Sequence, residues 1–424
     1  MKKIIETELG HYLSSFFFMK INTDEELVDF SKLKIETEST FVHEYVHFFQ
    51  DISTTYGLLT FAQIIDMIIS MTKNIHLEGE NSFHVPIVLN DDTAVGKAID
   101  ILSVIKGDDK LSYDIGSIKN IDLVKEELIA DIELFHCDLT CITTTNIECH
   151  LLFGSLCIIE GMAYHIENLL YDNIHPPEFP YKICDIIIKY KYPLLLDNEL
   201  NIVALCDIAL NSINPGRFFI ESLDHMRENK FIPKNPKEIY DFLLKYGYKK
   251  ENGEFITIKD LYPQLHSKAL KQIDFLFYDP ILTPIKEWTI NLLNKAFEKR
   301  TNEFAFLLNV FTGDKAQSKL KFFELVNTVG VPLMSNKDDS FCFPSQSIQV
   351  FNQMPIYRAI YELFNILSDK QKDCKLINLC KPTGIVTDDC HSQPWKWSTK
   401  DKKCTFGLVW ALYGLKGKVP LFNY

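Results

Sequence analysis

The segment that most constrains the fold is residues 40–51, Thr-Phe-Val-His-Glu-Tyr-Val-His-Phe-Phe-Gln-Asp, which carries two histidines four residues apart. On a helix this step stacks His43 and His47 on one face, where both imidazoles can bind one metal ion. Glu44 then lies about 100° further round the helix, beside such an ion. A carboxylate there can act as general base toward a water that Zn²⁺ has acidified. The pattern predicts a metal-binding helix that also supplies a base.

The flanking residues favour a helix. Thr37 and Ser39 are candidate N-caps for it. Apolar residues recur every three or four positions over residues 41–52, which gives the helix a face for packing. Gly57 is the expected stop, and the spacing of Leu, Ile and Met predicts a second, largely buried helix over 58–74.

Composition narrows the class of protein. The chain has 424 residues, of which 46% are hydrophobic and 24% charged, so it can bury one large core or two to three smaller ones. A net charge of −13 makes nucleic acid and anionic membrane surfaces unlikely partners. The apolar run Leu58 to Met71 carries Gln63 and Asp66 and is shorter than a bilayer span. Eleven irregularly spaced cysteines are typical of reduced thiols, so we expect a cytoplasmic protein with no membrane contact.

The second informative segment is residues 151–167, an apolar helical pattern with Glu160 in its middle. An unpaired buried carboxylate costs several kcal/mol, so this one needs a partner, and a metal ion is such a partner. The small residues Gly161 and Ala163 would let the helix approach another closely. Glu160 is therefore the candidate third ligand.

His-Glu-x-x-His followed downstream by Glu-Gly-x-Ala on a helix resembles the gluzincin zinc metallopeptidases. The resemblance covers only residues 39–57 and 150–170. It implies a zincin-like fold in which His43, His47 and Glu160 bind Zn²⁺ and Glu44 is the base.

Other residues remain alternatives to Glu160 as the third ligand, because Glu160 follows His47 by many more residues than in the gluzincin pattern. A surface insertion at about 76–120, where short apolar runs alternate with Gly, Asn and Asp, would account for the distance. The alternative ligands are Glu148, Glu133 and Asp131.

Helical spacing also selects residues that could support the ligands. Gln50 and Asp51 follow His47 by three and four residues, so either could accept a hydrogen bond from its second ring nitrogen. Glu167 lies two turns from Glu160 on the same face, with Tyr164 between them. The donor that a developing oxyanion requires is left open among Tyr164, His165, Arg217, His225 and Tyr357.

The C-terminal segment differs in composition. From residue 370 onward ten lysines face four acidic residues, and a structural Zn²⁺ is possible through its thiols and one imidazole. The candidate ligands are Cys374, Cys380, Cys390, His391 and Cys404. Buried reduced cysteines are the alternative, since the chain has no Cys-x-x-Cys pair in this segment.

We expect a mainly α (α+β) fold with a zincin-like core, a small sheet, a surface insertion and a helical, Cys-rich C-terminal part. The other expected elements are a strand at 12–21, a helix at 122–133, a strand or loop at 140–146, helices at 181–192, 201–212 and 217–228, and a helical block at about 262–310 broken by Pro280 and Pro284. The catalytic region would span residues 1–300, and residues 301–424 would pack on it as a Cys- and Lys-rich region.

The predicted function is hydrolysis of peptide bonds in an intracellular protein or peptide by a zinc metallopeptidase. Two alternatives stay open: a helical binding protein with zinc but no catalysis, and a chance occurrence of the motif in a helical interaction protein. The oligomeric state and the substrate are not specified by any residue pattern.

Overall fold

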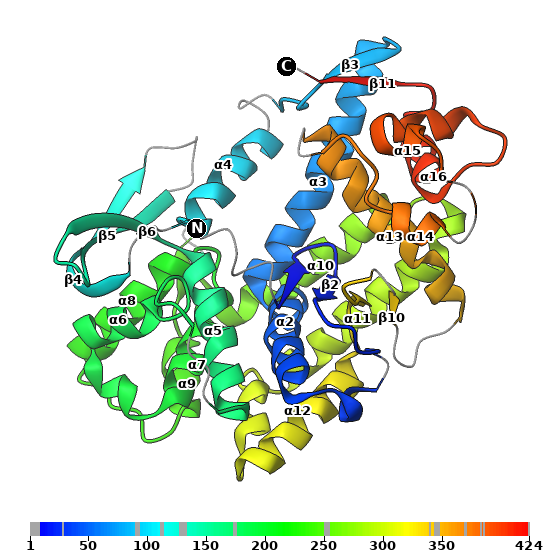
Figure 1. Ribbon diagram of the computed structural model, residues 1–424. Helices are drawn as coiled ribbons and strands as arrows, with labels where there is room; N and C mark the ends of the chain where they lie inside the picture. Colours follow the sequence, from blue (N-terminus) through cyan, green and yellow to red (C-terminus); the bar gives the residue numbers. More distant parts are fainter. Residues whose placement is uncertain are drawn as a thin grey trace.

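The computed structural model describes residues 9–27, 29–89, 94–110, 114–126, 134–172, 176–249, 255–338, 341–342, 348–368, 371–381, 384 and 386–422. The described chain is mostly helical with four small sheets (Figure 1). Its helices are α2 (Ile35–Ser53), α3 (Thr55–Glu78), α4 (Ala94–Lys106), α5 (Ser155–Leu170), α6 (Ile183–Lys191), α7 (Glu199–Leu210), α8 (Pro215–Glu228), α9 (Lys237–Leu243), α10 (Ile258–Leu276), α11 (Thr283–Asn302), α12 (Lys315–Val329), α13 (Ile348–Leu367), α14 (Ile377–Cys380), α15 (Asp389–Ser392) and α16 (Thr405–Leu412). Its strands are β1 (Gly10–Leu13), β2 (Phe18–Ile21), β3 (Ser82–Val85), β4 (Ile115–Glu126), β5 (Leu134–Thr143), β6 (Glu148–Phe153), β7 (Gly247–Lys249), β8 (Phe255–Thr257), β9 (Leu333–Ser335), β10 (Phe341–Cys342) and β11 (Val419–Phe422).

Helices α2 and α3 meet at a tight corner in the middle of the molecule. The helix predicted around His43 and His47 is confirmed as α2, but its N-cap is Lys34 rather than Thr37 or Ser39. Thr54 joins the two helices, and its hydroxyl caps α3 by accepting a hydrogen bond from the amide of Gly57 at 3.1 Å. The expectation that Gly57 ends the first helix was wrong, because Gly57 lies in the first turn of α3.

The expected strand at 12–21 is a hairpin of two strands, β1 and β2, rather than one strand. Ser15 and Phe17 adopt positive φ angles of 64° and 45° in the turn between them. Strand β2 pairs in parallel with β9, so the sheet has the order β1-β2-β9-β10 and leaves β1 at its edge. Because β9 follows residue 300 and β2 precedes it, the two expected regions share one sheet. The expected boundary itself falls within α11.

The segment expected to be a surface insertion contributes to the core. Within it, strand β3 pairs in parallel with β11 near the C-terminus, at the end of α3 farthest from α2 (Figure 1). Phe83 and Val85 of β3 are buried, and the ring of Phe83 stacks on that of Trp410 in α16, with centroids 6.2 Å apart.

The helix expected at 122–133 was wrong for its first residues, which belong to strand β4; residues 127–133 lie outside the described part. Ile121 and Leu123 are half-buried while Asp122 and Val124 are exposed, which is the alternation of a strand. Strands β4, β5 and β6 form an antiparallel sheet, so the strand alternative at 140–146 is correct for β5.

The later helices follow the predicted pattern. Helices α6, α7 and α8 occupy the three segments expected between 181 and 228. The block at 262–310 consists of α10 and α11, separated by a short 3-10 turn at Pro280–Leu282. Pro284 begins α11 instead of breaking it, since the first turn of a helix needs no amide donor from proline.

Helix α3 is longer than expected and meets the length and hydropathy of a membrane span over Thr55–Leu77. Buried core helices meet the same criterion, and 56% of the apolar window is buried inside the molecule. Helix α10 packs along α3 in the fold.

Candidate metal centre

The candidate metal centre lies between α2 and α5, two helices that pack directly on one another. The side-chain amide of Gln50 on α2 donates a hydrogen bond to the carbonyl of Ile159 on α5 at 3.0 Å. Gly161 lets α5 approach α6, because a Cβ there would lie only 3.3 Å from the sulfur of Cys184. These contacts fix the face of α5 that carries Glu160 opposite the face of α2 that carries the histidines.

The three predicted ligands converge. The Nε2 atoms of His43 and His47 each lie 3.3 Å from the same carboxylate oxygen of Glu160. Two ligand atoms about 2.1 Å from a tetrahedral Zn²⁺ stand about 3.4 Å apart, so the spacing fits such an ion. Among the described residues this is the one group of three or more His, Cys, Asp or Glu whose ligand atoms all lie within 4.8 Å of one another. The group can hold a metal ion.

The opposite nitrogen of each imidazole has its own partner. Nδ1 of His43 lies 3.0 Å from Oε2 of Glu167, and Nδ1 of His47 lies 3.1 Å from Oε1 of Gln50. Both partners accept, so each Nδ1 can donate its proton to them, and Nε2 is the nitrogen left to bind a metal ion when it carries no proton. This arrangement orients metal-binding histidines in other proteins. Glu167 is itself held by a hydrogen bond from the Ser39 hydroxyl.

Asp51 has a different role from the one expected. Its carboxylate accepts hydrogen bonds from the backbone amide of Ser15 at 2.6 Å and from the hydroxyl of Tyr12 at 2.9 Å. Asp51 therefore fastens the β1–β2 hairpin onto α2 instead of orienting His47. Burial raises the pKa of Asp51 to about 6, against the opposing effect of these two hydrogen bonds.

Electrostatics favour a cation at this place. Burial opposes charge on His43, but its hydrogen bonds to Glu160 and Glu167 outweigh burial and raise its pKa well above the usual value. Burial likewise opposes charge on Glu160, yet the two imidazoles hold its pKa below the usual range. With neutral imidazoles the two glutamates would leave a concentrated negative charge, which a divalent cation can neutralise.

Glu44 lies beside the ligands with a buried side chain. Burial raises the pKa of Glu44, and the neighbouring imidazoles of His47 and His43 partly oppose that rise. A carboxylate whose pKa is raised toward neutrality is a better proton acceptor and donor near neutral pH. Its position and environment suit a general base.

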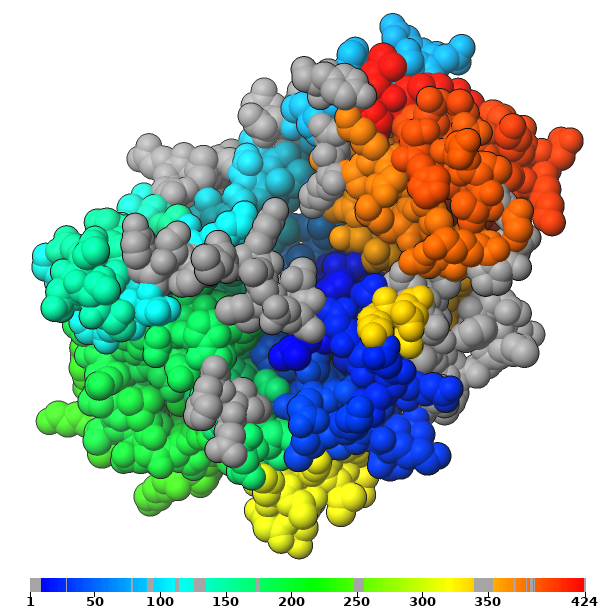
Figure 2. Space-filling model, viewed as in Figure 1, coloured from blue at the N-terminus to red at the C-terminus, as the bar shows by residue number. Residues whose placement is uncertain are grey.

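The three candidate ligands line a cleft of about 560 Å³. One wall is the edge strand β1, and Gly10 of this strand passes so near α2 that a Cβ there would lie 2.9 Å from Thr40 and 3.4 Å from Glu44. Tyr164 of α5 and Tyr181, just before α6, also line the cleft. In Figure 2 the blue surface of the N-terminal segment borders the green surface of the α5–α8 segment along this face.

The remaining sequence candidates lie elsewhere. Glu148 pairs with Lys119 at 2.6 Å on the exposed face of a sheet, and Asp131 and Glu133 are outside the described residues. Of the five candidate oxyanion donors only Tyr164 lines the cleft. The other four have partners away from it: His165 with Asp185, Arg217 with Glu221, His225 with Tyr246, and Tyr357 with Ser15.

Sequence reasoning missed several cleft residues, among them His11, Tyr12 and Tyr181, whose side chains carry polar atoms. Tyr12 begins the segment expected as a strand at 12–21, whereas His11 lies just before it. Tyr181 places its ring edge-on to His43 with centroids 5.8 Å apart. Its sequence neighbourhood, a proline-rich connector, contains no pattern that points to a ligand.

The candidate structural-zinc cysteines gather in the C-terminal part, where Cys374, Cys380, Cys390 and Cys404 line one pocket. His391 is exposed and does not line it.

Comparison of the chain with protein-family models, with curated proteins and with solved structures found no significant match. The site is thus defined by its own geometry: two imidazoles and one carboxylate that can hold a metal ion, with a buried carboxylate beside them in the same cleft.

Proposed function

We propose that the protein is a zinc-dependent metallopeptidase with a zincin-like core. In this proposal His43, His47 and Glu160 bind Zn²⁺ and Glu44 is the general base. The observation that carries it is the convergence of three ligand atoms in an open cleft, with Glu44 beside them. Three protein ligands with an accessible position are typical of catalytic zinc, whereas structural zinc is closed by four.

The residues divide the chemistry between them. Zn²⁺, when bound, would polarise the scissile carbonyl and acidify the attacking water. The Glu44 carboxylate takes a proton from that water and returns it to the leaving amine nitrogen. Glu167 and Gln50 keep both imidazoles in the tautomer that presents Nε2.

A peptide substrate agrees with the shape of the cleft. Within the described residues β1 pairs only with β2, and its residues Gly10, His11 and Tyr12 line the cleft. Addition of a strand to a sheet edge is a common way for proteins to hold a peptide irrespective of its sequence. The structure shows ten of the eleven cysteines free of disulfides, which supports a protein or peptide of the cytoplasm as the substrate.

The test combines metal content with cleavage. Purified protein should contain zinc at this site and cut members of an unbiased peptide library, with products identified by mass spectrometry. Glu44→Gln should keep the zinc and reduce cleavage by roughly 10²-fold or more. Glu36→Gln, in the first turn of the same helix, is the matched control and should cleave normally.

Each contrary result has a distinct meaning. Full cleavage by Glu44→Gln would reject Glu44 as the base. Zinc at the site without any cleavage would favour the non-catalytic binding protein, and absence of metal under all loading conditions would reject the centre altogether.

A further inference from the structure

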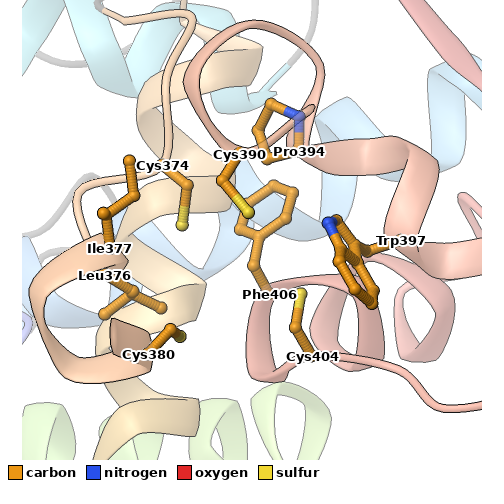
Figure 3. A pocket seen from close by; sticks show the side chains of 9 residues that line it. All are labelled: Cys374, Leu376, Ile377, Cys380, Cys390, Pro394, Trp397, Cys404 and Phe406. Carbon is orange, nitrogen blue, oxygen red and sulfur yellow. The ribbon is translucent and has the colours of Figure 1, made fainter. Parts of the chain in front are cut away.

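Four cysteines from separate segments meet in the C-terminal part of the fold. Cys374 precedes α14, Cys380 ends it, Cys390 lies in α15 and Cys404 caps α16. They line one small pocket, and Figure 3 shows their sulfurs directed toward its interior. The other lining residues are Leu376, Ile377, Pro394, Trp397 and Phe406. Four soft ligands thus face one another inside an apolar shell.

Hydrogen bonds hold these segments in place. The backbone amide of Cys374 donates to the carbonyl of Cys390 at 3.0 Å, which joins the segments before α14 and at α15. The sulfur of Cys404 accepts a hydrogen bond from the amide of Gly407 at 3.3 Å. Cys374 and Cys390 are 6% and 7% exposed, and none of the four cysteines is in a disulfide. Two of the four thiols are therefore well shielded, Cys380 and Cys404 are half-buried, and all four are free.

The space between the sulfurs suits a single ion. The pocket encloses about 10 Å³, which is about the volume needed for one water-sized sphere, and so it is too small for an organic ligand. The sulfurs of a tetrathiolate zinc site, with bonds of about 2.3 Å, stand about 3.8 Å apart. The four sulfurs are further apart than this: no three of them all lie within 4.8 Å of one another. Binding of one ion to all four therefore requires the sulfurs to move closer together, and rotation about the Cα–Cβ bonds moves a sulfur without moving the backbone.

We propose that Cys374, Cys380, Cys390 and Cys404 form a structural Zn²⁺ site with four thiolate ligands. His391 has no part in it. Four protein ligands and an apolar shell leave no position for substrate, which is characteristic of structural zinc. A zinc ion with four thiolates carries a net charge of about −2, and this segment offsets it with an excess of lysine, including Lys375, Lys381 and Lys403 next to three of the ligands in sequence.

Such an ion has a clear structural purpose here. Helices α14 and α15 have four residues each, too few to be stable on their own. An ion that joins four segments would stabilise a region with little regular structure, as structural zinc does in small domains. The same region leads into β11, which pairs with β3 beside the far end of α3. Removal of the ion should therefore loosen the C-terminal part first.

The first experiment counts zinc in the full-length protein carrying His47→Ala, which weakens the centre on α2. This variant should retain about one zinc per chain. Addition of Cys404→Ser should remove that zinc, whereas addition of Cys149→Ser, a half-buried cysteine of β6 outside the cluster, should not. Loss of the proposed peptidase activity and loss of this zinc are thus measured in different variants.

The second experiment identifies the ligands by their absorption spectrum, so its result does not depend on a cysteine substitution that could unfold the protein. Cobalt-loaded His47→Ala protein should display the thiolate-to-cobalt charge-transfer absorption of a tetrathiolate site. Cys380→His should still bind one ion, with weaker charge-transfer absorption, because imidazole is also a zinc ligand. Absence of thiolate absorption, or zinc content unaffected by Cys404→Ser, would overturn the proposal, as would a disulfide between any two of the four cysteines in alkylated protein.

Discussion

His43 lies between two carboxylates of α5: its Nε2 is 3.3 Å from Glu160 and its Nδ1 is 3.0 Å from Glu167. The two glutamates are two helical turns apart on one face of α5. This helix therefore supplies the candidate ligand Glu160 and also Glu167, which orients the candidate ligand His43. The imidazole is thereby fixed at both nitrogens before any ion arrives.

Glu167→Gln is expected to lower zinc affinity about 10- to 100-fold, because the neutral amide holds the Nδ1 proton of His43 less strongly. Competition with a chromophoric chelator measures the affinity. Asp172→Asn, which alters an exposed carboxylate just beyond the end of α5, is the matched control and should bind zinc normally. Unchanged affinity in Glu167→Gln would mean that Glu167 does not support the ligand.

Arg300→Met is expected to destabilise the fold by about 3–5 kcal/mol. Arg300 and Asp207 are both fully buried and joined by two hydrogen bonds of 2.6 and 2.9 Å. The substitution therefore leaves the Asp207 carboxylate buried without its cationic partner. Urea denaturation gives the free energy of unfolding. Lys237→Met, which breaks an exposed pair with Glu303, should cost at most about 1 kcal/mol. Equal losses in the two variants would contradict this account.

The pairing of His165 should make stability depend on pH. Burial opposes charge on this imidazole, but hydrogen bonds to Asp185 at 3.0 Å and Glu199 at 2.8 Å outweigh burial and raise its pKa to about 9. The pKa of His165 in the folded protein exceeds the unfolded value of about 6.5. The stabilisation of the fold by this pairing is therefore fully present below a pH of about 6.5 and is lost as the pH rises to about 9.

Between these pH values the free energy of unfolding should fall by roughly 2 kcal/mol more in the wild-type protein than in His165→Gln. His150→Gln, at an exposed histidine of β6, should keep the wild-type slope. Parallel slopes for wild-type and His165→Gln would refute the assignment.

Gly57→Ala is expected to destabilise the corner between α2 and α3 by about 1–3 kcal/mol. A Cβ at this position would lie 2.4 Å from the carbonyl oxygen of Gln50 and 2.5 Å from the backbone of Asp51, which cannot move without shifting the metal-binding helix. Thermal denaturation measures the loss. The control is Leu77→Ala, at an exposed position near the other end of α3. It removes side-chain atoms instead of adding one, and it should lower the stability less than Gly57→Ala does. The reverse order would contradict the role of Gly57.

The parts of the site that lie on one helix were predictable from sequence. Spacings of four, three and seven residues placed His47 with His43, Gln50 with His47 and Glu167 with Glu160, because helical geometry is local. The burial of a carboxylate in an apolar helix pointed to Glu160 without any knowledge of its partners.

Features that depend on distant segments were not predictable. Asp51 follows the same helical spacing as Gln50, yet the β1–β2 hairpin reaches it first and supplies Ser15 and Tyr12 as donors. Residues 122–126 fit a helical pattern as well as a strand alternation, and the ladder with β5 decides between them. The pairing of β3 with β11 joins segments that are far apart in the chain, and a local sequence pattern cannot predict such a contact.

The parallel pairing of β2 with β9 has a consequence for biosynthesis. Every proposed ligand of the metal centre precedes residue 168, whereas β9, the strand that pairs with β2 in the sheet beside the cleft, is Leu333–Ser335. At roughly 5–20 residues per second, translation of the intervening segment takes about 10–30 s. During that interval the hairpin of β1 and β2 has no parallel neighbour, so the cleft to which we assign peptide binding lacks part of the sheet beside it.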